Sequence, residues 1–291
     1  MTRKIAFAFG GQGSEFARAG HAWQSDEAFA IASRATGVDV GRALDRLSAD
    51  LRRTSVLQGA LVCVSCAALE RLVARGVTPS LVCGHSVGEV AAWVASGAID
   101  PREAIAFAVA RGRAMERAAE QSPGGMLAVD ATHHVPFADL EIAAKNAPTQ
   151  TVLTGPLAAL DAARARTGGR RLDVSGPWHS RAMRAARDDT ARALAAITPR
   201  AMKTPLVTCV DGRVLAPLEK PDFVAQLTSP VDWIAVAETL ERERVTDVVC
   251  VCPGRVNRGL FREIFGVRVA LHLADEDADL DRIARLLGGS A

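Results

Sequence analysis

The chain has 291 residues, enough for one large domain or for one domain that carries a smaller insert. Hydrophobic residues make up 49% of the chain, so a sizeable core can form. The 35 basic and 33 acidic residues leave a formal charge of only +2, which gives no indication of nucleic acid or of an anionic membrane as a partner. A local basic patch for an acidic protein is compatible with this balance, because net charge does not say where the charges lie.

The N-terminal segment and the cysteines favour a cytoplasmic protein. The segment turns glycine-rich after about five apolar-biased residues, which are too few for a signal peptide. No apolar run approaches the roughly 18 residues of a membrane span. Cys63 and Cys66 form C-x-x-C in a stretch typical of a buried helix, and no second pair follows at metal-finger spacing. We therefore expect structural thiols, no metal and no cofactor.

Strand-like apolar runs alternate with helical periodicity, which predicts an α/β fold with a largely parallel sheet. Strands are expected at residues 4–9, 80–83, 206–210, 247–251 and 267–272. Helices are expected at residues 57–75, 87–97, 101–120, 180–196, 233–244 and 277–287.

The sequence Ser-Pro-Gly-Gly at 122–125 breaks this alternation. It is followed by strand-like residues 126–129 and 151–153, a helical stretch 157–166 and a strand-like stretch 171–174. We therefore expect a small α+β insert at 124–178, with the large domain formed by residues 1–123 and 179–291.

Residues 84–88 read Gly-His-Ser-Val-Gly and match the nucleophile motif G-x-S-x-G. They follow a short strand and open a helix that Gly97 would end. The glycines allow a sharp turn, so the Ser86 hydroxyl would stand exposed at a helix N-terminus, whose positive potential suits an oxyanion. Ser86 and Glu89 also form S-x-x-E, so the same residues fit an ordinary helix capping box.

A serine nucleophile needs a base, and His179 is the candidate. It lies in the stretch SGPWHS between a predicted strand and a predicted helix, where α/β proteins tend to present site residues. His85 adjoins the serine and should point away from it, while His133 and His134 lie in a polar loop. An ordinary surface histidine would fit position 179 equally well.

Five separated stretches occur in order: FAFGGQGSE at 7–15, GHSVGE at 84–89, RGRAME at 111–116, NAPTQTVLTG at 146–155, and QLTSPVDW at 226–233 with Pro253-Gly254. Singly they are weak motifs. Together they resemble the malonyl-CoA:acyl carrier protein transacylase family, which includes the acyltransferase domains of polyketide synthases. The resemblance covers essentially the whole chain. It implies an α/β-hydrolase-like large domain with a parallel sheet and a small ferredoxin-like insert.

The same resemblance implies an acyltransferase that moves a malonyl group from CoA to the phosphopantetheine thiol of an acyl carrier protein. Ser86 would carry the acyl group in a ping-pong reaction, and His179 would act as its base and then as an acid. A main-chain carbonyl near Gln226 would orient the imidazole in place of a carboxylate. The backbone N–H groups of Gln12 and Val87 would form the oxyanion hole.

The resemblance also assigns the acyl pocket. Arg111 would bind the free malonyl carboxylate, for which its planar guanidinium has the right bidentate geometry. Without the family pattern, Arg111 fits a solvated residue of a charge-rich helix. Gln58 resembles a glutamine that lines the same pocket. Trp178 stands where the family usually has phenylalanine or serine, so its size argues against a bulky branch on the acyl α-carbon.

Other departures from the family pattern concern loops. Gly10 replaces a proline, and Cys250 and Cys252 replace the usual glutamate and glycine, so we expect a rearranged loop at Pro253. Only about ten residues, 131–140, separate two strand-like parts of the insert. We therefore expect a truncated ferredoxin-like unit without a full first helix and a more open cleft on that side.

Other functions stay open at this point. A hydrolase that clears acyl carrier proteins would use Ser86 and His179 in the same way, but it would have no obvious use for Arg111. A non-catalytic carrier-binding subunit would be expected to lack Ser86 or His179, and a lipase-type esterase would need an acid between them in the chain. The pathway, whether fatty acid, polyketide or malonate decarboxylation, is not indicated.

Overall fold

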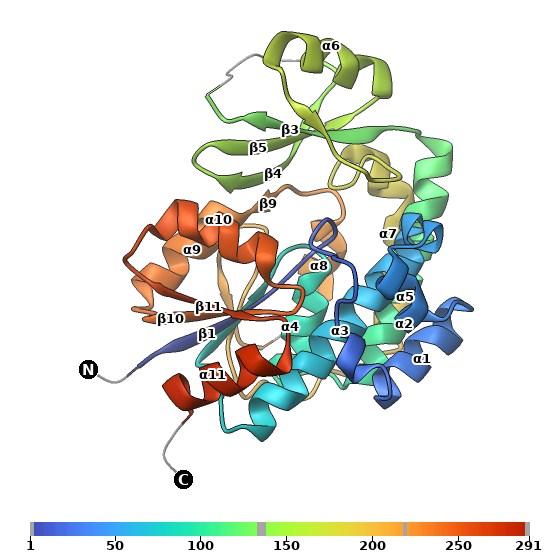
Figure 1. The fold of residues 1–291 in the computed structure, drawn as a ribbon. Coiled ribbons are helices and arrows are strands. Elements are labelled where there is room, and N and C mark those ends of the chain that lie inside the picture. The colour runs from blue at the N-terminus through green and yellow to red at the C-terminus, as the bar shows by residue number, and fades with distance from the viewer. Residues whose placement is uncertain (1–2, 133–137, 218–219, 289–291) are drawn as a thin grey trace.

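The computed structural model describes residues 3–132, 138–217 and 220–288, and two sheets organise this part of the chain (Figure 1). The larger sheet has six strands, in the order β11 (Ala270–Ala274), β10 (Asp247–Val251), β1 (Ile5–Phe9), β2 (Leu81–Gly84), β7 (Leu206–Val207) and β8 (Val214–Leu215). All neighbours in it are parallel except β7 and β8. The predicted α/β fold with a largely parallel sheet is confirmed.

The large sheet is covered on both faces, as expected for a parallel sheet. Phe7 and Phe9 of β1 pack into one core with α1 (Glu27–Thr36), α3 (Thr54–Ala74), α4 (Gly88–Ala95) and α11 (Asp277–Leu287). Ala6 and Ala8 point the other way and pack with α9 (Trp233–Arg242) and α10 (Arg255–Phe265). The remaining helices are α2 (Val40–Arg46), α5 (Pro101–Gln121), α6 (Leu157–Thr167), α7 (Arg187–Ala195) and α8 (Lys220–Gln226), with short 3-10 turns η1 (His21–Trp23), η2 (Ala49–Arg52) and η3 (Arg181–Ala186).

Helix α3 corrects one expectation from the sequence. Its 21 residues are long and apolar enough to cross a membrane by length and composition, whereas no such run was expected. However, 83% of its most apolar window is buried inside the protein. A helix that is apolar on all sides is also typical of a protein core, and α3 is such a core helix.

Helices α3 and α5 cross at very close range, and this crossing positions part of the site. Gly112 of α5 lies against the α3 backbone, because a Cβ at position 112 would be 2.4 Å from the Cα of Ser55. A second glycine, Gly59 of α3, faces Val109, whose side chain would be 2.7 Å from an added Cβ. The contact brings Gln58 of α3 beside Arg111 of α5.

The smaller sheet has five strands, in the order β6 (Arg170–Arg171), β3 (Gly125–Asp130), β5 (Gln150–Gly155), β4 (Glu141–Ala147) and β9 (Val231–Asp232). Helix α6 packs on one of its faces. Met126 and Val152 lie on the other face, in the same core as β10 and α9. In Figure 1 this unit stands above the large sheet, and β9 joins it from the C-terminal half of the chain.

The insert differs from expectation in its strands. The expected strand at 171–174 is reduced to the two residues of β6. Strand β4 was not predicted, because register shifts interrupt its pairing with β5 and its sequence shows no clear alternation of apolar and polar residues. Between β3 and β4, the described residues 131–132 and 138–140 contain no helix. Residues 133–137, including His133 and His134, lie outside the description.

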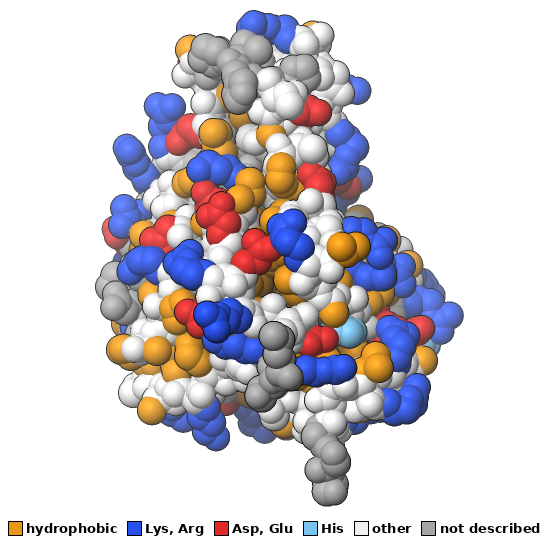
Figure 2. Space-filling model, turned by 90° about the vertical axis from the view of Figure 1, so that its left-hand side faces the viewer, with side chains coloured by type: hydrophobic (Ala, Val, Ile, Leu, Met, Phe, Trp, Pro, Cys, Tyr) orange, Lys and Arg blue, Asp and Glu red, His pale blue; other side chains and the backbone are white. Residues whose placement is uncertain are grey.

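The surface seen in Figure 2 carries basic and acidic side chains that are interspersed rather than separated. Ion pairs of the described residues with at least partly exposed side chains include Lys145–Asp232 and Arg268–Glu241. Basic and acidic side chains are therefore mixed on this face, just as their numbers are nearly equal in the whole sequence.

Candidate active site

Ser86 stands on a sharp turn between β2 and α4. Its φ is 52°, in the left-handed region that side chains other than glycine rarely adopt. The flanking glycines are required by space: a Cβ at Gly84 would lie 2.1 Å from the carbonyl carbon of Gly88, and a Cβ at Gly88 would lie 2.4 Å from the Phe9 oxygen. The turn therefore has the close packing that exposes a nucleophile at a helix N-terminus.

The same turn corrects the capping-box alternative. Helix α4 begins after Val87 without a side-chain cap, and the Glu89 carboxylate turns into the protein instead. Gly97, with φ of 83°, follows the helix end as predicted.

Ser86 and His179 come together although 93 residues separate them in sequence. The Ser86 Oγ and the His179 Nε2 are 2.7 Å apart. The His179 Nδ1 lies 3.0 Å from the main-chain oxygens of both Gln226 and Ser229. Because carbonyl oxygens only accept, Nδ1 carries the proton and Nε2 presents its lone pair to the serine hydroxyl.

His179 is neutral at physiological pH. Its side chain is buried, and this burial lowers the pKa of the imidazole to about 3, helped by the positive charge of Arg111 and by His85. Neutral carbonyls hold its Nδ1 side, and no carboxylate within the described ranges hydrogen-bonds to it.

Arg111 is 1% exposed, which excludes the solvated-helix alternative. Its Nη1 donates to the Gln58 Oε1 at 2.7 Å, and its Nη2 donates to the Gln226 Oε1 at 3.0 Å. The Nε is buried and has no partner within the described residues. Burial lowers the pKa of Arg111 to about 10, so the group stays charged at neutral pH. A guanidinium has five N–H donors, so several remain free for a ligand.

A cavity of about 90 Å³ connects these groups. It is lined by Ser86, His179 and Arg111, and also by the predicted residues Gln12, Gln58, Val87 and Trp178. Met115, Met126 and Val152 add apolar surface. Gln226 does not line the cavity, but lies behind it and holds both Arg111 and His179.

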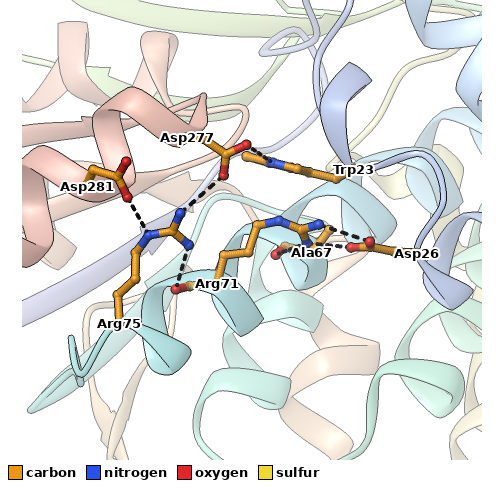
Figure 3. Close-up of polar contacts among 7 residues, drawn as sticks. All are labelled: Trp23, Asp26, Ala67, Arg71, Arg75, Asp277 and Asp281. Carbon is orange, nitrogen blue, oxygen red and sulfur yellow. Dashed lines mark hydrogen bonds and ion pairs between the residues drawn. The ribbon is translucent and has the colours of Figure 1, made fainter.

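A larger groove of about 920 Å³ lies elsewhere, between α1, α3 and the start of α5, and none of the predicted site residues lines it. Two pairs of its charged side chains form ion pairs across the groove lining, Arg71 with Asp26 and Arg102 with Glu27. Figure 3 shows Arg71 between Asp26 and the Trp23 ring, whose centroid is 5.2 Å from the guanidinium carbon. These contacts join neighbouring helices, so we interpret the charged residues of the groove as stabilising the fold.

Residues 7–230 match the family model described as acyl transferase domain. The malonyl CoA-acyl carrier protein transacylase of Mycobacterium tuberculosis H37Rv is 33% identical over 273 residues, which cover 87% of this chain and 89% of the relative. The chain belongs to the malonyl-CoA:acyl carrier protein transacylase family.

Solved transacylase structures agree with the fold. A transacylase from Xanthomonas oryzae pv. oryzae superimposes with a TM-score of 0.89 at 29% identity, covering 99% of both chains. Another, the malonyl-transacylase in the complex of PlMCAT with the type II polyketide acyl carrier protein AntF, gives a TM-score of 0.88 at 28% identity, covering 97% of this chain and 99% of that one.

Some contacts of this transacylase site were not predicted from the sequence. The His85 Nε2 pairs with the Asn146 Oδ1 at 2.9 Å, and Asn146 in turn donates to Gln150 at 2.9 Å, so the turn that holds Ser86 is tied to the smaller sheet. Both amides lie in the stretch NAPTQTVLTG, which is one of the five stretches that carry the family resemblance, so the sequence did mark this region. Ser229, the second acceptor for His179, lies in the stretch QLTSPVDW, whereas Phe223 beside Arg111 lies in none of the quoted stretches.

Proposed function

We propose that this transacylase moves a malonyl group from CoA to the phosphopantetheine thiol of an acyl carrier protein through a covalent intermediate on Ser86. The observation that carries the proposal is the 2.7 Å contact between Ser86 and His179 in the same cavity as the buried Arg111. Malonyl-CoA and an acyl carrier protein are the donor and acceptor in the names of the similar proteins.

In the first half-reaction, the His179 Nε2 takes the hydroxyl proton as the Ser86 Oγ attacks the thioester carbonyl. The C–S bond then breaks, the imidazolium gives its proton to the departing CoA sulfur, and the acyl group remains on the serine. In the second half-reaction, His179 takes the proton of the carrier thiol, and the sulfur attacks the acyl-serine. The C–O bond breaks and the proton returns to Ser86, so the enzyme is regenerated.

The proposed oxyanion hole consists of the backbone N–H groups of Gln12 and Val87. Both residues line the cavity, and Val87 is the first residue of the turn that opens α4. Neither N–H donates to an acceptor within the described part of the chain. A pair of such donors stabilises the negative oxygen of each tetrahedral intermediate.

Arg111 supports the choice of a malonyl donor. Its hydrogen-bond partners are the neutral amide oxygens of Gln58 and Gln226, so no side-chain carboxylate among the described residues occupies the guanidinium directly. Burying a cation is costly unless it is paired, and a substrate carboxylate would supply that pairing. A hydrolase of simple acyl groups would gain nothing from this arrangement.

Trp178 would limit the acyl group. It is 3% exposed, and its six-membered ring is packed so tightly that a Cβ at Gly176 would lie 2.5 Å from the Cη2 atom. The ring therefore cannot yield easily to a branched α-carbon.

We also propose the finer description of the architecture and location. Residues 1–123 and 179–291 would form an α/β-hydrolase-like domain, and residues 124–178 a truncated ferredoxin-like insert to which β9 is added. All six cysteines are free and buried, which suits a reducing cytoplasm.

Intact-mass spectrometry tests the proposal. Incubation with malonyl-CoA is expected to add one malonyl mass to the wild type and none to Ser86→Ala, and added holo-carrier is expected to remove it as malonyl-carrier. Labelling that persists in Ser86→Ala would exclude Ser86 as the nucleophile. Loss of the label to water as fast as to the carrier would instead indicate a hydrolase.

A further inference from the structure

Glu89 is a buried carboxylate for which the proposed reaction has no use. It lies in the first turn of α4 and is 2% exposed. Its Oε2 accepts from the backbone N–H of Cys209 at 2.9 Å, and the Thr208 hydroxyl lies 3.3 Å from both carboxylate oxygens. Burial raises the pKa of Glu89, while these hydrogen bonds lower it. A carboxylate is costly to bury, so this one calls for a reason.

The reason lies in its third neighbour, the side-chain amide of Gln226. The Gln226 Nε2 is 3.3 Å from the Glu89 Oε2, and the Gln226 Oε1 accepts from Arg111 at 3.0 Å. The main-chain oxygen of the same residue accepts from His179. Gln226 therefore contacts both the proposed carboxylate-binding group and the proposed base.

The charges of Glu89 and Arg111 determine the orientation of the Gln226 side-chain amide. An ionised carboxylate only accepts hydrogen bonds and a guanidinium only donates them. The NH₂ end of Gln226 must therefore face Glu89, and its oxygen must face Arg111. If the amide were reversed, two donors would meet at Arg111 and two acceptors at Glu89.

The amide also keeps the two charges apart. In a direct ion pair, the Glu89 carboxylate would occupy guanidinium N–H groups that a substrate carboxylate needs. With Gln226 between them, Glu89 neutralises the buried cation at a distance while the Arg111 Nε stays free.

We propose that Glu89 is a positioning residue that orients the Gln226 amide and thereby holds Arg111 ready for a carboxylate-bearing acyl group. This inference rests on the proposed function. It assigns to the last residue of the GHSVGE stretch a role in selecting the donor, distinct from the chemistry at Ser86.

The test compares malonyl-enzyme and acetyl-enzyme formation rates in single-turnover mass spectrometry. Glu89→Ala is expected to lower the malonyl-to-acetyl rate ratio by roughly tenfold, within the usual range for residues in one hydrogen-bonded network. Gln226→Ala removes the amide but keeps the main-chain oxygen that holds His179. In that background, Glu89→Ala is expected to change the ratio less than about twofold, because its effect passes through the amide.

Two further variants separate positioning from folding. Glu89→Gln keeps the volume of the side chain but can donate as well as accept, so it is expected to lower the ratio even if the alanine variant does not fold. Asp275→Asn is the matched control: Asp275 is 6% exposed, accepts the Gly254 N–H at 2.8 Å and does not line the cavity. It is expected to lower stability and leave the ratio unchanged.

The outcomes are distinct. If Glu89 variants lower both rates by one factor, or change the ratio equally with and without the Gln226 side chain, Glu89 is only structural and the inference is wrong. A wild type that is acetylated but never malonylated would contradict the proposed function itself, and the inference with it.

Discussion

At the scale of single residues, Trp178 is the residue that we propose limits the size of the acyl group. Its indole is packed against Gly176 and lines the cavity with Met126 and Val152. One methyl group is worth roughly 1–3 kcal/mol in a pocket, so malonyl-CoA should be preferred over methylmalonyl-CoA by about 10–200-fold. Trp178→Ser should narrow this preference in a competition assay with both donors. Equal use of the two donors by the wild type would show that the indole does not bound the acyl site.

His179 gives a second prediction, on pH. Because its pKa is lowered to about 3, the imidazole remains a free base as the pH falls from 8 to about 5. With acetyl-CoA, which has no titrating carboxylate, the acylation rate should therefore stay nearly constant over that range in stopped-flow measurements. An acid limb centred near the ordinary histidine value of about 6.5 would contradict the buried, neutral state.

The lowered pKa of His179 also predicts the direction in which stability changes with pH. Between about pH 6.5 and 3 the unfolded chain binds a proton at His179 that the folded protein does not. The free energy of unfolding should therefore decrease as the pH falls through this window, and His179→Gln should reduce the slope.

At the scale of elements, the crossing of α3 and α5 brings Gln58 and Arg111 together. Gly112→Ala would place a methyl group 2.4 Å from the Cα of Ser55, so the backbone of α3 or of α5 would have to move. Overpacking of this kind costs about 1–3 kcal/mol, which calorimetry should register as a lower Tm. The matched control is Gly259→Ala in α10, where an added Cβ meets nothing within 4 Å and helix propensity should make it neutral or stabilising. Equal effects of the two substitutions would mean that the close crossing is not what matters.

Elements also show where sequence reasoning succeeds. Strand β10 at 247–251 and helix α11 at 277–287 were predicted to the residue, because each has a clear period and clear ends. Helix α10 was missed, although it is amphipathic, and β8 and β9 are two-residue strands that only tertiary pairing defines. The capping-box alternative for S-x-x-E is wrong, because the Glu89 carboxylate is buried and accepts the N–H of Cys209 instead of capping the helix.

At the scale of the whole molecule, the residues expected at the site lie together because strands and helices distant in sequence end at one cavity. Motifs predicted Ser86, His179 and Arg111, but only the fold reveals that Gln226 contacts two of them by different groups. A sequence does not show that the side chain and the main-chain oxygen of one residue contact different partners. The role of Glu89 was hidden for the same reason.

The central claim is that the chain selects a malonyl donor by means of Arg111, and one measurement tests it most directly. The rates of malonyl and acetyl transfer to a holo-carrier should be compared for the wild type and Arg111→Ala. Removing one partner of a buried charge pair costs on the order of 2–5 kcal/mol, so malonyl transfer should fall by roughly 30-fold to several-thousand-fold. Acetyl transfer should fall little or rise, because an acetyl group has no carboxylate to bind. If both rates fall by the same factor, Arg111 is structural and the malonyl assignment loses its physical basis.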